Sequence, residues 1–187
     1  IISHAHLDHV GLLPYLYKMG YKGPTYMTSP TRDIAALISL DFIGVAYKQA
    51  AQPLFDSKDI KEMVKHTICI GYNEVTDITP DLRLTFYNSG HALGGALIHL
   101  NIGNGSHNLV YTGDFKYGRS RLLDPAVANF PRAETVITES TYGSKKDILP
   151  PRREAEQKLI ELVNKTIERK GKVLIPELGL GRAQESM

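Results

Sequence analysis

The sequence predicts an α/β layered domain with polar, metal-binding types of residue at the ends of its strands. Three observations predict this class. Short apolar strands recur along the chain, and helical patterns are interleaved with them. Several strands run directly into a loop that carries a histidine or an acid. Three of the seven histidines, His4, His6 and His9, lie within six residues of one another, with Asp8 between the last two.

The first half of the chain alternates short strands with helices. The predicted strands are residues 1–3 (the end of a buried strand), 24–28, 67–71 and 73–78. Three helices are predicted. The first covers residues 11–19, the second begins at a cap formed by Ser29 or Thr31 with Pro30 in its first turn, and the third covers residues 57–64 with Ser57 as its cap. The apolar faces of the first two are expected at Leu12, Leu13 and Leu16, and at Ile34, Leu37, Ile38 and Phe42. Residues 45–56 fit either helix or loop.

The second half begins with strands and ends with helices. Residues 82–87 alternate apolar and polar side chains, which is typical of a strand. Further strands are expected at residues 96–102, 108–112, 136–138 and 172–175, with a hairpin turn at Asn104-Gly105. A long helix is expected at residues 152–170, with Ala155, Leu159, Leu162, Val163 and Ile167 on one face and Gly171 at its end. A second helical pattern starts at Gly181.

Composition is that of an ordinary globular protein. Of its 187 residues, 42% are hydrophobic and 22% charged, and no apolar run approaches the roughly 20 residues that span a bilayer. The net charge of +2 is too small to indicate nucleic-acid binding by itself. The single cysteine, Cys69, excludes an internal disulfide and suits a reducing cytoplasm; its apolar neighbours predict a small core residue. The chain opens on apolar residues without Met, so we expect upstream structure to be absent from it.

The segment His4–His9 predicts a metal site. Imidazole nitrogens and carboxylate oxygens are ligands that suit zinc and similar divalent ions. Alternate residues of an extended segment point the same way, so His4 and His6 can reach one ion. Asp8 and His9 can turn toward a second ion close by. The alternative is a solvated polar loop that is rich in histidine.

Three later strand ends carry further candidates. His91 lies in a glycine-rich turn, SGHALGG at residues 89–95. Asp114 comes at the end of the apolar strand predicted at residues 108–112, and Glu139 follows the apolar strand predicted at residues 136–138. Taken alone, each also has a purely structural interpretation: His91 as a histidine whose hydrogen bonds are made within the turn, and the two acids as residues that cap or form a turn.

Together these motifs resemble those of the metallo-β-lactamase superfamily. The series His4–His9, His91 and Asp114 matches its metal-binding residues. ESTYG at residues 139–143, GKVLIP at 171–176 and GRAQE at 181–185 resemble the β-CASP ribonuclease group, the relatives of the endonuclease subunit of the cleavage and polyadenylation specificity factor. YTGDFKYG at residues 111–118 and PRREAE at 151–156 are most similar to the archaeal members.

The resemblance implies a fold, although it also implies that much of that fold lies outside this chain. It implies an αββα sandwich, of which the chain holds about half. Residues 1–178 are expected to form a partial metallo-β-lactamase domain, and residues 179–187 the opening of a truncated β-CASP domain.

The resemblance also implies two zinc ions and a role for each site residue. The first ion would be held by His4, His6 and His91. Asp8 and His9 would belong to the second, with Asp114 bridging the two, which suits a carboxylate because it has two oxygens. A hydroxide activated by both ions would attack the phosphate.

Glu139 would act with Asp8 as a catalytic residue, orienting a histidine that protonates the leaving oxygen. That histidine and another ligand of the second zinc are expected downstream of Met187. The second site would therefore be incomplete in this chain, and the chain alone inactive. His66, His99 and His107 are expected to have structural or surface roles instead.

The implied activity is zinc-dependent cleavage of RNA in 3′-end processing or transcription termination, as an endoribonuclease with 5′–3′ exonuclease action as a further option. The implied setting is the cytoplasm, away from membranes, with a homodimer formed through segments outside this chain. Basic residues near the site loops are candidate phosphate contacts: Lys116, Arg119, Lys145 and Arg152. Two alternatives stay open, another hydrolase of this fold that acts on DNA or thioesters, and a non-catalytic scaffold subunit of an RNA-processing complex.

Overall fold

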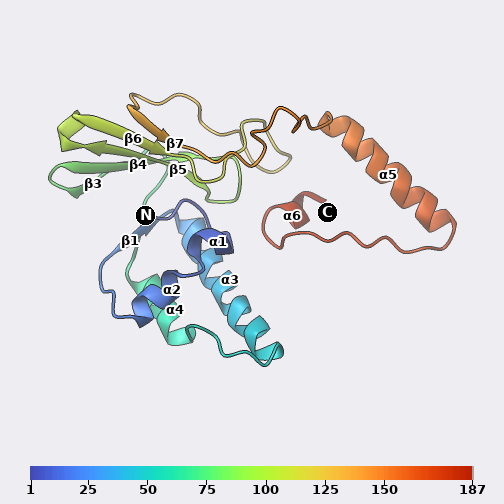
Figure 1. The fold of residues 1–187 in the computed structure, drawn as a ribbon, viewed down its shortest axis with the longest axis horizontal. Helices are drawn as coiled ribbons and strands as arrows, with labels where there is room; N and C mark the ends of the chain where they lie inside the picture. The colour runs from blue at the N-terminus through green and yellow to red at the C-terminus, as the bar shows by residue number, and fades with distance from the viewer. Residues whose placement is uncertain (187) are drawn as a thin grey trace. The chain divides into compact units, whose positions relative to one another are not determined.

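The computed structural model describes residues 1–186, in two units that are described separately below, Ile1–Glu139 and Ser140–Ser186. Within the described residues, the first unit holds two sheets and helices α1 to α4, and the second holds α5 and α6 (Figure 1). This mixed content confirms the predicted α/β class. No helix among these residues combines the length and the apolar character that crossing a membrane requires.

The larger sheet has five strands in the order β3-β4-β5-β6-β7. Their bounds are β3 Val75–Thr79, β4 Leu82–Asn88, β5 Ala96–Ile102, β6 His107–Tyr111 and β7 Thr135–Ile137. Neighbours are antiparallel from β3 to β6, whereas β7 runs parallel to β6. The β5–β6 turn is the short helix η1 (Gly103–Gly105), where Asn104 adopts a φ of 53°. The predicted strands of this sheet are confirmed to within a residue or two at each end.

The core of this sheet lies on its central strands. Leu84 and Phe86 of β4 have no exposed surface and pack with Ala96 and Ile98 of β5 and with Ile70. Phe86 pairs directly with Ile98 across the two strands. The apolar positions that alternate in β4 therefore form this core, as the sequence predicts.

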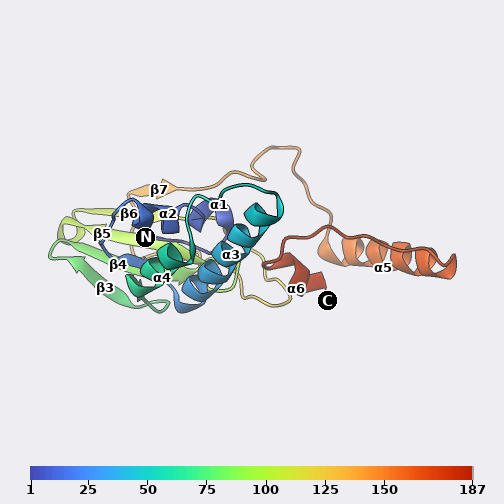
Figure 2. The ribbon, with the colours of Figure 1, turned by 90° about the horizontal axis from the view of Figure 1, so that it is seen from below.

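The smaller sheet and the four helices lie to one side of the larger sheet (Figures 1 and 2). The smaller sheet pairs β1 (Thr25–Met27) in parallel with β2 (Thr67–Cys69). The helices are α1 Leu7–Val10, α2 Leu13–Lys18, α3 Ser29–Lys48 and α4 Ser57–Lys65. A reciprocal capping box between Asp56 and Asp59 starts α4, so the cap is Asp56 and the predicted Ser57 is wrong.

The cap predicted for α3 is also wrong. Thr28 is the cap, and its hydroxyl accepts a hydrogen bond from the backbone N–H of Thr31. The predicted face of α3 is partly wrong as well, because Leu37 is 67% exposed while Ala35 and Ile43 are buried. The buried face of α3 is a narrow stripe of mostly small side chains, Thr31, Ala35, Ser39 and Ile43, although the helix has larger apolar residues.

The other corrections in this unit concern edges of the structure. Residues 1–3 form no strand; the backbone bonds at this segment are Ile2 N–H to the carbonyl of Tyr26 and Ala96 N–H to the carbonyl of Ser3. Leu12 and Leu16 are exposed, and α2 buries Pro14 and Tyr17 instead.

Cys69 is exposed as well, so its predicted place in the core is wrong. It is the last residue of β2, whose residues are half-buried or exposed, and the chain becomes buried only at the next residue, Ile70. Apolar neighbours in the sequence therefore do not bring the thiol into the core.

In the second unit, α5 spans Arg152–Glu168 and α6 spans Arg182–Ser186. The predicted face of α5 is exposed for the most part, with Leu162 at 58% and Ile167 at 62%. Residues 172–175 form no strand, and Leu174 is 93% exposed. A strand needs a partner for its backbone, and within this unit none is present for residues 172–175.

Shortening Phe86 to alanine should destabilise the protein by about 3–5 kcal/mol, because it leaves a cavity among fully buried side chains. Denaturant unfolding of the metal-free protein measures this. Val75→Ala is the control, since Val75 is 65% exposed on the edge strand β3. Equal stability of the two variants would contradict the core described above.

Candidate metal centre

The topology of the large sheet brings three candidate loops to one edge. β4 and β6 are both antiparallel to β5, and β7 is parallel to β6, so β4, β6 and β7 all point the same way. Their C-terminal ends therefore share an edge. His91 lies just after β4, Asp114 just after β6 and Glu139 just after β7.

The N-terminal segment reaches the same edge. Ser3 accepts the backbone N–H of Ala96, which is the first residue of β5 and so lies at that edge. His6 has an extended backbone, and α1 begins at the next residue, Leu7. Asp8 and His9 therefore project from a helical turn, immediately after His4 and His6.

Three imidazole nitrogens converge at this place. His6 Nδ1 lies 3.0 Å from His4 Nε2 and 3.0 Å from His91 Nε2. With a carboxylate oxygen of Asp114, these ligand atoms all lie within 4.8 Å of one another. Nitrogen atoms that face one point in this way suit a cation at their centre.

Asp114 presents its two oxygens to different histidines. Its Oδ2 lies 3.5 Å from His91 Nε2 and 3.8 Å from His4 Nε2. Its Oδ1 lies 3.5 Å from His9 Nε2. Asp8 Oδ2 lies 3.4 Å from the same nitrogen of His9. The six residues predicted as metal ligands thus lie together, with Asp114 between two groups of them.

The electrostatics keep His4 in the form that binds a cation. Burial, and then the neighbouring His9, His91 and His6, lower the pKa of His4 to about 3. The ring is therefore neutral at neutral pH. Ser3 Oγ lies 3.1 Å from His4 Nδ1, so the hydroxyl partners one ring nitrogen while Nε2 faces the other ligands.

Gly113, next to Asp114, permits the Asp114 loop to lie close to Ser3, and its role was not predicted from the sequence. Gly113 adopts a φ of +52°, and a Cβ on it would come within 2.7 Å of Ser3 Oγ. The loop that carries Asp114 can therefore lie directly against Ser3. The position of this glycine, immediately before the candidate ligand Asp114, is the sequence feature that could have predicted the close approach.

Glu139 lies beside the Asp114 loop rather than among the six predicted metal ligands. Its Oε1 accepts the backbone N–H of Phe115 at 3.2 Å. This hydrogen bond ties the end of β7 to the residue that follows Asp114. Its catalytic role, like that of Asp8, stays a prediction.

The other three histidines considered have partners elsewhere. His66 Nδ1 lies 2.9 Å from the carbonyl oxygen of Glu62, His99 Nε2 lies 2.8 Å from that of Arg132, and His107 Nε2 lies 3.0 Å from the hydroxyl of Thr135. These contacts agree with the structural roles expected for them.

The basic candidates fall into both units. Lys116 and Arg119 follow Asp114 in the first unit, and Arg119 lies 3.5 Å from Asp124. Lys145 and Arg152 belong to the second, where Arg152 bonds Glu156 at 2.7 Å. Contact of any of the four with a substrate stays a prediction.

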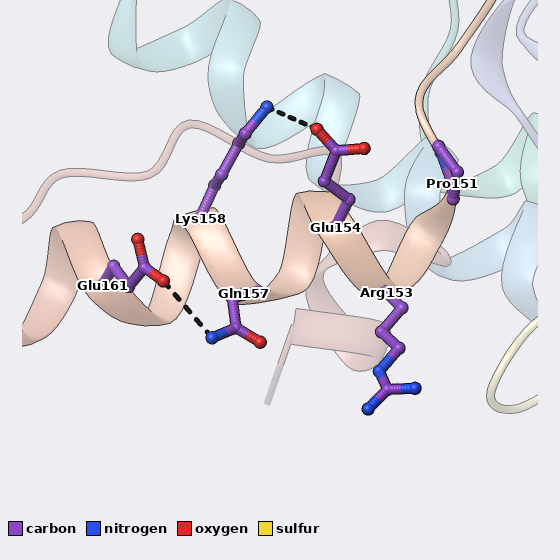
Figure 3. Close-up of a pocket in the computed structure, with 6 residues that line it drawn as sticks. All are labelled: Pro151, Arg153, Glu154, Gln157, Lys158 and Glu161. Atoms are coloured by element: carbon purple, nitrogen blue, oxygen red, sulfur yellow. Dashed lines mark hydrogen bonds and ion pairs between the residues drawn. The ribbon is translucent and has the colours of Figure 1, made fainter.

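A shallow pocket on α5 contains none of the metal-type residues (Figure 3). Apart from Pro151 at the helix cap, its lining comes from one helix, and Glu154 bonds Lys158 at 2.8 Å within it. Glu161 accepts a hydrogen bond from Gln157 within the same helix, and the pocket lining indicates no chemistry.

Tyr72 supports the His91 loop, and it predicts a pH effect. Its hydroxyl donates to the carbonyl of Gly95 at 2.8 Å, and burial raises the pKa of Tyr72 to about 12. Between its ordinary pKa of 10.0 and about 12, the folded protein holds this proton more tightly than the unfolded chain does. Stability should therefore fall as the pH rises through that range.

The measurement compares wild type with Tyr72→Phe by denaturant unfolding between pH 9 and pH 12. The variant should lose less stability across this range, because it lacks the group whose proton is held. Parallel curves for the two proteins would contradict the raised pKa of Tyr72.

Comparison with known proteins places these observations in a family. Residues 1–141 match the family model described as the metallo-beta-lactamase superfamily domain. The chain is 56% identical to the transcription termination factor FttA of Pyrococcus horikoshii and 55% identical to that of Methanothermobacter thermautotrophicus, over all of its length. It is 51% identical to the FttA of a Lokiarchaeum species over 99% of its length. The chain spans 29% of the length of each of these relatives.

These findings confirm the resemblance to archaeal relatives and the predicted metallo-β-lactamase fold class. The matched region contains every predicted metal ligand together with the edge where they meet. The chain belongs to the metallo-β-lactamase superfamily.

Proposed function

We propose that the protein containing these residues is a zinc-dependent hydrolase that cleaves RNA phosphodiester bonds during transcription termination. The observation that carries the proposal is the convergence of His4, His6, His91 and Asp114 within 4.8 Å. His9 and Asp8 lie next to the other oxygen of Asp114, and this second group of possible ligands supports a second ion.

The donor set fits zinc. Four donors placed tetrahedrally about 2.0–2.1 Å from zinc lie about 3.3 Å from one another. Four of the separations, 3.0, 3.0, 3.5 and 3.8 Å, lie on both sides of that value, and all of them are within 4.8 Å. When bound, such ions lower the pKa of water and stabilise charge that develops on a phosphate.

The residues of this chain would prepare the centre in different ways. His4 stays neutral through its burial, so it needs no loss of a proton to offer Nε2. Asp114 would bridge the two ions through its separate oxygens. Glu139 would hold the backbone of the Asp114 loop through Phe115, in addition to orienting a histidine outside this chain.

The choice of RNA rests on the relatives and on the motifs after Glu139. The relatives are named transcription termination factors, and RNA is the product of transcription. Lys116 and Arg119 are our candidates for contacts with its phosphates in the first unit. Endonucleolytic cleavage, 5′–3′ trimming and a homodimer belong to this proposal as further expectations.

Cleavage of matched oligonucleotides by the complete protein tests the proposal. The protein is stripped with a chelator, dialysed, and given RNA or DNA of one sequence with and without added zinc. We expect cleavage of RNA that returns with zinc. Equal cleavage of DNA would favour another hydrolase of this fold, and absence of cleavage with zinc bound would favour a scaffold protein.

A further inference from the structure

We infer that Thr28 and Thr31, at the start of α3, are positioning residues that hold the His91 loop in place for metal binding. This inference rests on the metal centre of the proposed function, and it concerns residues outside the ligand set. Its basis is a pair of buried hydroxyls that meet one backbone carbonyl of the loop.

The carbonyl oxygen of Gly94 lies 2.7 Å from Thr28 Oγ1 and 2.9 Å from Thr31 Oγ1. Thr28 is 4% exposed and Thr31 has no exposed surface. A carbonyl oxygen has two lone pairs, so it can accept from both hydroxyls at once. These bonds connect residues more than 60 positions apart in the sequence. The two hydroxyl oxygens also lie 2.9 Å from each other, so the proton of Thr28 has the Thr31 hydroxyl as a second acceptor.

Gly94 can approach α3 this closely because it has no side chain. Its φ is +78°, and a Cβ would lie 2.7 Å from Thr28 Oγ1 and 2.8 Å from the backbone nitrogen of Thr31. The same hydroxyl of Thr28 also accepts the N–H of Thr31 at 3.3 Å as the cap of α3. The end of the His91 loop is therefore seated on the first turn of a 20-residue helix.

The loop transmits this anchorage to His91 because it is closed by its own hydrogen bonds. Gly95 N–H donates to Ala92 at 2.8 Å, and Ser89 N–H donates to Gly95 at 3.0 Å. The backbone N–H of His91 reaches Ser89 Oγ at 3.4 Å. A shift of Gly94 therefore moves the segment that carries His91.

The contact is placed where a small displacement matters. His91 Nε2 lies 3.0 Å from His6 Nδ1 and 3.5 Å from Asp114 Oδ2, and it comes from a loop, whereas His6 comes from the segment before α1. Bringing the imidazoles together around one cation needs the loop held against that other segment. Loss of either hydroxyl leaves the Gly94 carbonyl with one of its two hydroxyl partners, so the loop is held less firmly against α3.

Thr31→Val tests the inference, because it removes a hydroxyl, keeps the shape of the side chain and leaves the Thr28 cap in place. Zinc affinity is measured by competition with a chelator dye, and the geometry by the visible absorption of the cobalt(II)-substituted complete protein. We expect zinc binding about 10–100-fold weaker and altered cobalt bands, whereas Thr31→Ser should restore both.

Thr25→Val is the matched control. Thr25 is also a buried threonine of the first unit, and its hydroxyl lies 2.7 Å from that of Tyr17, away from the His91 loop. It should lose a comparable hydrogen bond without changing zinc affinity or the cobalt spectrum. An equal loss in Thr25→Val would assign the effect to general destabilisation and overturn the inference.

Two further outcomes separate this inference from the proposed function. Wild-type affinity in Thr31→Val would overturn the role of the threonine pair and leave the metal centre standing, whereas a wild-type protein that binds no zinc would overturn both. If Thr31→Val loses its cooperative unfolding transition, Thr31→Ala replaces it, since alanine suits a helix and also lacks the hydroxyl. It should again bind zinc more weakly than Thr31→Ser.

Discussion

Replacing Asp114 by asparagine should lower RNA cleavage by the complete protein at least about 1000-fold, which corresponds to about 4 kcal/mol of transition-state stabilisation. Asparagine keeps the shape and one oxygen but substitutes an amide nitrogen, which cannot bind a cation, for the other. Asp114 is the residue that faces both groups of histidines, through Oδ2 and Oδ1. Single-turnover cleavage of a labelled RNA measures the loss.

Asp124→Asn is the control for this prediction. Asp124 is an exposed acid in the same stretch of chain, and it faces only Arg119 among the ion pairs of the described residues. The variant should cleave RNA as wild type does. Full activity in Asp114→Asn would remove Asp114 from the centre and favour the scaffold reading.

Replacing His6 by alanine should weaken zinc binding at the three-histidine site at least about 100-fold, because it removes a ligand rather than an outer-shell partner. His6 Nδ1 is 3.0 Å from each of the other two imidazole nitrogens, so the variant loses the nitrogen that both of them face. Competition with a chelator dye measures the affinity, and metal analysis after dialysis measures the amount retained.

His107→Ala serves as its control. His107 is a histidine of β6 whose Nε2 lies 3.0 Å from the Thr135 hydroxyl, outside the centre. Its removal should leave zinc content unchanged. If His107→Ala and His6→Ala lose zinc equally, the metal is held somewhere other than the predicted centre.

Much of the sheet and of the ligand set could be predicted from the sequence because both depend on local patterns. The alternation in β4 marks the face that Phe86 and Leu84 bury, and the motif His4–His9 shows its chemistry in six residues. His91, Asp114 and Glu139 were each ambiguous alone. What joins them is the shared direction of β4, β6 and β7, which is a property of the whole sheet.

The errors arose where tertiary contacts decide the outcome. Leu37 and Cys69 are apolar in the sequence and exposed in the structure, because burial depends on which neighbours a face meets. Residues 172–175 have the composition of a strand but no backbone partner within their own unit. The cap of α3 was predicted at Ser29 or Thr31, whereas Thr28 is the cap, and its hydroxyl contacts both that helix and the His91 loop.

The domain boundary predicted at residue 178 stays a prediction. The structure divides the chain after Glu139, which reflects how contacts cluster within residues 1–186. Unlike that boundary, the family is shown directly, because the match over residues 1–141 contains all the predicted metal ligands.

Anomalous X-ray scattering across the zinc absorption edge, from crystals of the complete protein, tests the proposed centre most directly. We predict an anomalous peak about 2.0–2.2 Å from His4 Nε2, His6 Nδ1, His91 Nε2 and an oxygen of Asp114. A second peak is expected beside His9 and Asp8, on the other oxygen of Asp114. A fully occupied zinc site elsewhere in the protein, with no peak among these residues, would contradict the assignment.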